Sequence, residues 1–417
     1  MGVCLMVSRT NHEYDIVIVG ASAAGLTAAT RFREVDRESS ILMISKEGNR
    51  PYSRVQIPYI LRGAVPYENI YLKDDAFFEE HRIHTLEDTV VSMDAQLDLL
   101  ELAGGDLIHY KKLLIATGTR PLAPKIPGIN SPGVYNLWDL EDLDALLEKL
   151  DQVHEVIILG SGFISLQAAW AYVVQNKKVT ILELRDHIMA NSLDAQLAAY
   201  FEQGMSKYSV NLRKDTQVIE IERADKLRLR TSDNVVFEGD VLVMGVGTAV
   251  PRAFYTDQIA FDHGILVNRR MQTSKENIYA AGDVALVPLK GLDQNCNLPL
   301  WSTAVQMGSV AGWNLAGRDV EYEGAVRSNV TEMFGMTIIT AGDLFGESQV
   351  FTLDYGVLKL FTEQSVLVGF VFIGQSEEYE LFGPLLQSIR DAIMGCVELK
   401  DIQEQMDVRV ALTLEVD

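Results

Sequence analysis

Two distant segments of this chain repeat one pattern: an apolar run, a glycine turn and a stretch of small residues. The first is DIVIVGASAAGL at residues 15–26, and the second is VIILGSGFISLQ at residues 156–167. In each, the β-branched run that ends in glycine predicts a buried parallel strand, and the small residues after it predict a helix. This geometry directs the first N–H groups of the helix toward a pyrophosphate. Two such units predict two bound dinucleotides in one chain.

The rest of the sequence predicts an α/β chain with a separate domain at its end. The chain has 417 residues, enough for two or three domains. Buried strands are expected at residues 15–19, 41–45, 113–118, 156–159, 179–183 and 241–245, helices at 24–35 and 139–150, and a hairpin turn at Gly104-Gly105 before a strand at 107–110. After residue 325, short strands at 350–353, 356–360 and 366–373 precede helical patterns, which predicts an α+β domain.

Composition excludes several classes of partner and site. The net charge of −22 argues against nucleic acid and anionic membranes as partners, and it would also repel an acidic carrier protein. The cysteines at positions 4, 296 and 396 have no C-x-x-C spacing, so we expect no metal site and no dithiol centre, and the role of Cys296 is open. The N-terminus has no signal-peptide pattern, which predicts a cytoplasmic protein.

Carboxylates after predicted strands are candidates for binding the dinucleotides. Glu183 ends the second strand of the second unit, where a carboxylate can bind ribose hydroxyls and repel the 2′-phosphate of NADPH. The alternative is a solvated charge at a strand end, and the nearby Arg185 leaves some tolerance of NADPH open. Glu47 is the corresponding candidate in the first unit. Asp283 follows the run IYAAG, where its carboxylate could accept hydrogen bonds from a ribitol chain, and Ser302 could cap a helix over residues 303–315.

The ordered set of motifs resembles the FAD-dependent pyridine nucleotide oxidoreductases. GASAAG at 20–25 is similar to their FAD fingerprint, IATGTRP at 115–121 to their middle motif, GSGFIS at 160–165 to their NAD turn, and YAAGD at 279–283 to a later FAD motif. PYSR at 51–54 with IPYILRG at 57–63 resembles the rubredoxin reductase, nitrite reductase and NADH oxidase branches. The resemblance implies two Rossmann-like dinucleotide-binding domains plus a C-terminal α+β domain. The implied divisions are 1–122 with 246–324 for FAD, 123–245 for NAD, and 325–417 for dimerisation.

The resemblance also assigns residues to each cofactor. Together with the carboxylates above, the implied FAD residues are Gly20, Ser22, Ala23, Ala24, Gly25, Glu47, Arg54, Val90, Ala116, Thr117, Gly118, Arg120, Gly282, Asp283, Trp301 and Ser302. The implied nicotinamide-nucleotide residues are Gly160, Gly162, Ile164, Glu183 and Gly247. Phe163 takes the place of an aromatic ring that shields the flavin until nicotinamide arrives, although ordinary packing at a helix start is the alternative.

Three departures from the family pattern bear on the chemistry. Val55 or Gln56 stands where the NADH oxidase and CoA-disulfide branches carry a cysteine, which argues against a thiol mechanism. Tyr59 and Gln167 stand where ferredoxin-reductase types pair a Lys with a Glu, so the residues expected nearest the flavin are uncharged. Ser165 replaces the third glycine of the NAD turn, which should crowd the helix against the strand.

These observations predict an FAD enzyme that takes hydride from NADH, with NADPH a poorer donor. The acceptor is left open between a rubredoxin- or ferredoxin-type carrier and a small organic molecule or oxygen. A third possibility is a non-catalytic flavoprotein that serves as a binding module. In the resembling family the C-terminal domain forms a homodimer, and the apolar run at 366–373 is compatible with that.

Overall fold

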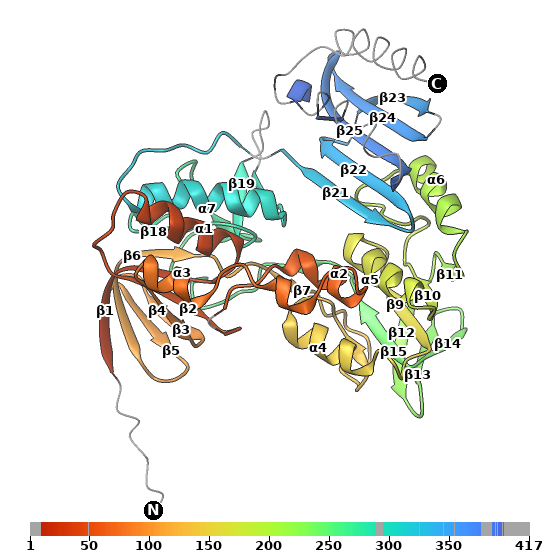
Figure 1. Ribbon diagram of the computed structural model, residues 1–417, viewed down its shortest axis with the longest axis horizontal. Helices are drawn as coiled ribbons and strands as arrows, with labels where there is room; N and C mark the ends of the chain where they lie inside the picture. The colour runs from red at the N-terminus through yellow and green to blue at the C-terminus, as the bar shows by residue number, and fades with distance from the viewer. Residues whose placement is uncertain are drawn as a thin grey trace, which may run out of the picture. The chain divides into compact units, whose positions relative to one another are not determined.

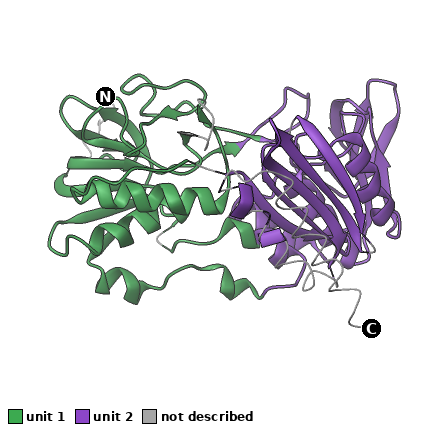
Figure 2. Ribbon diagram, turned by 90° about the horizontal axis from the view of Figure 1, so that it is seen from above, with its two compact units in different colours: residues 1–56, 66–120, 248–325 green, residues 57–65, 121–247, 326–417 purple. Residues whose placement is uncertain are grey.

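The computed structural model describes residues 10–48, 50–288, 295–324, 326–344, 346–353 and 355–376, with the helical residues 386, 387, 389, 391–393 and 395. The chain forms two compact units, shown in green and purple in Figure 2. The first unit contains residues 1–56, 66–120 and 248–325, and the second contains 57–65, 121–247 and 326–417. The predicted α/β class with two Rossmann-type folds is confirmed. The exact three-domain boundaries stay a prediction.

A parallel sheet forms the centre of the first unit. Its order is β3 (Ile83–Glu87), β2 (Ile41–Ser45), β1 (Asn11–Val19), β6 (Leu107–Ile115) and β18 (Ile278–Ala280). Residues 16–19 of β1 and 41–44 of β2 are buried, because both faces of the sheet are covered. The two apolar runs therefore form adjacent strands, as the sequence predicts.

Strand β6 corrects one expectation. The sequence pattern predicts separate strands at residues 107–110 and 113–118, but residues 107–115 form one strand. Its first half pairs antiparallel with β5 (Leu99–Leu102), which pairs with β4 (Val90–Asp94), and its second half pairs parallel with β18. The polar residues between the halves do not break the strand, since the whole of β6 pairs parallel with β1, with Tyr110 opposite Tyr14 and Lys112 opposite Ile16.

Helices α1 (Ala23–Arg33) and α7 (Trp301–Leu315) pack side by side in this unit (Figure 1). The close approach depends on glycine: a Cβ at Gly308 would lie 2.4 Å from the carbonyl oxygen of Ala24. Arg33, at the end of α1, is buried and donates to the carbonyl oxygens of Asp36, His81 and Arg82. The other elements in and bordering this unit are η1 (Arg54–Gln56), η2 (Tyr67–Ile70), α3 (Asp75–Glu80), β7 (Arg120–Pro121), β16 (Thr248–Ala249), β17 (Ile265–Leu266), β19 (Ala285–Pro288) and β20 (Asn295–Cys296).

The second unit repeats the parallel arrangement. Its sheet has the order β11 (Val210–Arg213), β10 (Lys178–Leu182), β9 (Glu155–Leu159), β15 (Val241–Met244) and β8 (Val134–Tyr135). The helices are α2 (Ile57–Leu61), α4 (Leu140–Lys149), α5 (Phe163–Val174) and α6 (Ala195–Met205). A smaller antiparallel sheet joins β12 (Val218–Arg223), β13 (Leu227–Thr231) and β14 (Val236–Gly239).

The C-terminal part of this unit is an antiparallel sheet. Its order is β21 (Ser328–Met333), β22 (Met336–Gly342), β25 (Val366–Gln375), β24 (Gly356–Glu363) and β23 (Glu347–Leu353). The helical residues Leu386, Ile389, Ala392 and Ile393 pack on it, in agreement with the α+β prediction. The sequence pattern does not predict the hairpin β21–β22, because residues 336–341 are all buried and show no alternation of apolar and polar residues.

Across the described residues, no helix has the length and apolar character needed to cross a lipid bilayer. The uncharged stretch at 156–174 is divided between strand β9 and helix α5.

Candidate functional site

The described helices differ in how their first turns are capped. Helices α3, α4 and α6 each follow an aspartate whose side chain accepts a backbone N–H, and these pairs are Asp74–Phe77, Asp139–Asp142 and Asp194–Leu197. Helices α1, α5 and α7 follow Ser22, Gly162 and Leu300, and none of these three residues supplies a side-chain cap. The free N–H groups at these helix starts are suited to a phosphate or another electron-rich group.

The first glycine turn needs its glycines for geometric reasons. Gly20 has φ +115°, and a Cβ there would lie 2.2 Å from the carbonyl oxygen of Ala116. A Cβ at Gly25 would lie 1.9 Å from the carbonyl oxygen of Gly20. The turn therefore brings the start of α1 close to the end of β6, with Ser22 half-buried at the helix N-cap. A diphosphate fits such a cradle by its chemistry.

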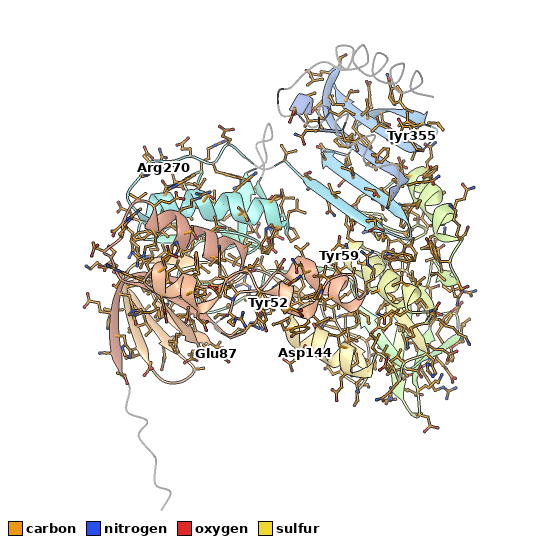
Figure 3. All side chains as sticks on the ribbon, in the orientation of Figure 1. Tyr52, Tyr59, Glu87, Asp144, Arg270 and Tyr355 are labelled. Carbon is orange, nitrogen blue, oxygen red and sulfur yellow. The ribbon has the colours of Figure 1, made fainter. Side chains whose placement is uncertain are left out.

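Two predicted FAD residues, Glu47 and Arg54, form an ion pair. Tyr52, labelled in Figure 3, donates its hydroxyl proton to Oε2 of Glu47 at 2.7 Å. Burial alone would raise the pKa of Glu47, but the charges of Arg54 and Lys46 and the Tyr52 hydroxyl bring it below its ordinary value. Glu47 is thus held ionised just after β2, where a ribose hydroxyl could reach it.

Among the described carboxyl groups of the first unit, Asp283 has a clearly raised pKa. It follows the turn at Gly282, which has φ +77°, and burial raises the pKa of Asp283 to about 6, although Arg54 and its own backbone N–H favour the ionised form. A carboxylate desolvated in this way is a strong acceptor for ligand hydroxyl groups. A Cβ at Gly118, which has φ +69°, would meet no described atom within 4 Å, so the backbone there borders open space.

The remaining predicted FAD residues occupy varied environments. Ala23, Ala24 and Val90 are buried, Trp301 is partly buried against the core of the first unit, and Ala116 is half-buried. Thr117 and Arg120 are exposed. Ser302 does not cap α7, contrary to the prediction, because the helix already begins at Trp301 and Leu300 is its N-cap. The helix therefore begins two residues before the predicted start, and its first residue, Trp301, packs on the core of the unit.

In the second glycine turn a serine replaces the usual third glycine, and a glycine elsewhere in the fold makes room for it. Gly160 has φ +95°, and a Cβ at Gly162 would meet no described atom within 4 Å. Ser165 is buried at the place of the third glycine, and its Oγ donates to the carbonyl oxygen of Gly245 at 2.9 Å. A Cβ at Gly245 would lie 2.1 Å from that Oγ. The expected crowding is therefore relieved by a glycine on the neighbouring strand's end.

Glu183 lies directly after β10, at the carboxyl edge of the sheet, as predicted. Its Oε2 accepts a hydrogen bond from Oγ of Ser161, and its Oε1 accepts one from the backbone N–H of Arg185 at 2.8 Å. The carboxylate is half-buried and has no cationic side chain paired with it among the described residues. Its remaining acceptor positions suit ribose hydroxyl groups.

Four exposed apolar side chains follow the same edge of the second unit. Ile164 is the second residue of α5, Leu184 follows Glu183, and Val246 and Leu122 flank Gly247, which has φ +111°. Their exposed fractions are 40%, 64%, 37% and 45% respectively. Exposed apolar residues grouped at a strand edge are typical of a ligand groove. Only Ile164 is predicted from the sequence, because isolated apolar residues in loops carry no periodic signal.

The residues predicted nearest the chemistry all border α5 or α2 in the second unit. Phe163 is half-buried at the start of α5, and Gln167 donates to Oγ1 of Thr331 at 2.6 Å. Helix α2 packs against α5, and its Tyr59 (Figure 3) lies beneath the guanidinium of Arg62, 5.2 Å from the ring centroid.

Arg62 also pairs with Glu332 at 3.6 Å. Arg62 lies in the run IPYILRG at 57–63, but that pattern gives it no partner, and Thr331 and Glu332 belong to no motif. These three residues come together only in the fold.

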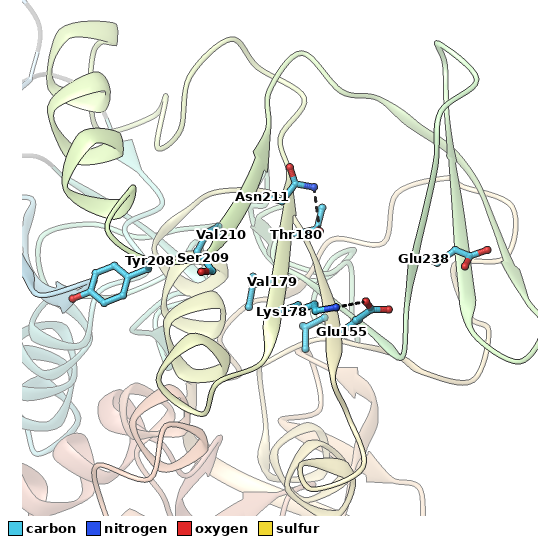
Figure 4. A pocket seen from close by; sticks show the side chains of 10 residues that line it. Glu155, Lys178, Val179, Thr180, Tyr208, Ser209, Val210, Asn211 and Glu238 are labelled. Atoms are coloured by element: carbon cyan, nitrogen blue, oxygen red, sulfur yellow. Dashed lines mark hydrogen bonds and ion pairs between the residues drawn. The ribbon is translucent and has the colours of Figure 1, made fainter.

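A pocket of about 520 Å³ lies at the opposite edge of the same sheet (Figure 4). It is formed by the amino ends of β9, β10 and β11, and its Lys178 pairs with Glu155 at 3.4 Å. Open parallel sheets bind ligands at their carboxyl ends. We therefore assign the nucleotide to the edge that carries Gly160 and Glu183.

The segment where a redox cysteine would stand carries none. Val55 is 51% exposed and Gln56 is half-buried, both on η1. Cys296, on β20, is half-buried and forms no disulfide with another described residue. The electron path of this chain therefore does not use a thiol at position 55 or 56.

Comparison with known proteins gives a consistent result. A family model described as pyridine nucleotide-disulphide oxidoreductase matches residues 14–308. The NADH-dependent phenylglyoxylate dehydrogenase subunit epsilon of Aromatoleum evansii is 30% identical over 342 residues, which cover 81% of each chain. Rhodocoxin reductase of Rhodococcus erythropolis is 30% identical over 314 residues, 74% of this chain and 73% of that protein.

One solved structure extends the similarity to the fold. The NAD-dependent persulfide reductase from A. fulgidus superposes with a TM-score of 0.86 and 26% identity, over 93% of this chain and 78% of that one.

Proposed function

The chain belongs to the pyridine nucleotide-disulphide oxidoreductase family and is an FAD-dependent NAD(P)H oxidoreductase, and we propose that it transfers electrons between NADH and a separate small redox protein. The observation that carries this proposal is the pair of carboxylates at the carboxyl edges of two Rossmann-type folds, Asp283 and Glu183. Each stands beside a helix that begins without a side-chain cap.

The residues of the first unit suit FAD. The N–H groups at the start of α1 would hold the pyrophosphate of FAD. Glu47, fixed by Tyr52 and Arg54, would accept a hydrogen bond from a ribose hydroxyl group. Asp283 would accept hydrogen bonds from hydroxyl groups of the ribitol chain. FAD, when bound, supplies the hydride and electron chemistry.

The residues of the second unit suit NADH. Glu183 would bind the adenosine ribose, and the start of α5 would hold the pyrophosphate. Phe163 would cover the nicotinamide position in the free enzyme. Neither Tyr59 nor Gln167 has a charge, so the protein would contribute orientation and exclusion of water, not proton transfer, near the reacting atoms.

The acceptor is inferred from the missing thiol. With Val55 and Gln56 in place of a redox cysteine, electrons would leave the flavin directly, which suits an external carrier. Rhodocoxin reductase, a relative named for such a carrier, supports this choice. The subunit from Aromatoleum evansii suggests that the carrier could belong to a larger dehydrogenase assembly. The homodimer and the cytoplasmic setting stay predictions.

A second candidate function is the reduction of a small molecule or oxygen. The net charge of −22 favours it, because acidic carriers would be repelled. The test is steady-state NADH oxidation with a panel of acceptors: rubredoxin, a [2Fe–2S] ferredoxin, a small quinone and oxygen. Fast reduction of one carrier, with a rate that depends on ionic strength, supports the proposal. Turnover with quinone or oxygen alone supports the second candidate.

A further inference from the structure

Ser161, the residue between the two glycines of the second turn, has a buried hydroxyl group with one particular partner. Its side chain is 3% exposed, and its Oγ donates to Oε2 of Glu183. The backbone N–H of Met189 approaches the same Oγ at 3.4 Å. The Met189 N–H is a donor, so the Ser161 Oγ is the acceptor in that contact. The single hydroxyl proton of Ser161 is therefore donated to Glu183.

The second oxygen of the Glu183 carboxylate is also held. Oε1 accepts the backbone N–H of Arg185 at 2.8 Å. The backbone of Glu183 is fixed on both sides, because its N–H donates to Arg213 and its carbonyl oxygen accepts from Thr216, each at 2.8 Å. Each carboxylate oxygen can accept about two hydrogen bonds, so each keeps one position for a ligand hydroxyl group.

The turn itself does not require serine at this position. Ser161 has no positive φ, so its backbone conformation is open to any residue. The hydroxyl group is therefore explained by its contact with Glu183 and not by the geometry of the turn.

We propose that Ser161 is a positioning residue that holds Glu183 in the orientation which selects NADH over NADPH. This inference rests on the proposed function. A carboxylate held at both oxygens cannot turn away from the 2′-phosphate of NADPH, and it repels that phosphate. Arg185 is exposed and its guanidinium forms no ion pair with another described residue. Without the Ser161 bond, Glu183 could turn away and Arg185 could pair with the phosphate.

The test compares the holoenzyme variants Ser161→Ala and Ser165→Ala by their KM and kcat for NADH and NADPH. Loss of one hydrogen bond to a charged group should raise the KM for NADH by about tenfold. The ratio of the two KM values should move toward NADPH by about tenfold or more, with kcat at saturating NADH nearly unchanged. Ser165→Ala removes an equally buried hydroxyl that bonds to Gly245 instead, so it should leave this ratio unchanged.

A double mutant separates positioning from a general structural role. If Ser161 acts through Glu183, Ser161→Ala should not change the nucleotide ratio further in a Glu183→Ala background. An unchanged ratio in Ser161→Ala, an equal change in Ser165→Ala, or an additional change in the double mutant would each overturn the inference. A wild-type holoenzyme that does not oxidise NADH would instead contradict the proposed function.

Discussion

Replacement of Asp283 by Asn should stabilise the FAD-free protein while it weakens FAD binding. Burial raises the pKa of Asp283 from 3.8 to about 6, against the opposing effect of Arg54. At 1.36 kcal/mol per pKa unit, this rise corresponds to roughly 3 kcal/mol of cost for the ionised form in the folded protein. Asp283 is half-buried by surface area, and the amide keeps a desolvation cost of its own, so we expect about 1–3 kcal/mol to be recovered by the neutral amide at pH 7.5.

The sign of the pH dependence follows from proton binding. Between pH 3.8 and 6 the folded protein binds more protons at Asp283 than the unfolded chain does, so the contribution of this group to stability falls as the pH rises through that range. About half of the cost should already be present at pH 5. The advantage of Asp283→Asn over wild type should therefore grow from pH 5 to pH 7.5.

The assay is urea unfolding of FAD-stripped protein at several pH values, followed by titration with FAD. Asp262→Asn, which neutralises an exposed carboxylate, serves as the control and should match wild type. FAD should bind Asp283→Asn at least about tenfold more weakly, because the amide is a poorer acceptor for ligand hydroxyls. An apoprotein variant less stable than wild type at pH 7.5, or unchanged FAD affinity, would refute the reasoning.

Three further predictions follow from packing and exposure. Gly245→Ala should lower the free energy of unfolding by about 1–3 kcal/mol, because the added Cβ would meet Oγ of Ser165 at 2.1 Å. Adding Ser165→Gly should restore stability in denaturant unfolding, and a double variant without this rescue would contradict the contact. Arg33→Met should lower the free energy of unfolding by about 2–4 kcal/mol, since three carbonyl oxygens lose their donor. The control Arg37→Met, at an exposed position, should be near neutral, and equal denaturant midpoints for the two variants would contradict this role of Arg33. Leu184→Asp should raise the KM for NADH by about tenfold, because Leu184 lies beside Glu183. Its thermal stability should be unchanged, since Leu184 is 64% exposed. An unaltered KM would show that Leu184 does not contact the nucleotide.

The parts of the fold that are predictable from the sequence depend on local geometry. The glycines at 20 and 160 are needed for positive φ and for close approach to a neighbouring strand, so the turn can be inferred from a few adjacent residues. The position of Glu183 follows in the same way from the end of its strand. Such features require no knowledge of distant contacts.

The parts that are not predictable depend on residues that are distant in sequence. Gly245 makes room for Ser165, 80 positions earlier, and no local pattern connects them. The pairing of Gln167 with Thr331 likewise arises from tertiary packing across 164 positions. The predicted start of α7 is wrong: Ser302 is a good cap by residue type, but the helix already includes Ser302 and begins at Trp301, which packs on the core.

Reduction of bound FAD by NADH is the step on which the proposed function depends, and anaerobic stopped-flow mixing measures this step. The purified yellow protein is mixed with NADH or NADPH, and the visible flavin band is followed. NADH should bleach the flavin band quickly and NADPH much more slowly, because Glu183 repels the 2′-phosphate. A flavin band that neither nucleotide bleaches would contradict the proposed function.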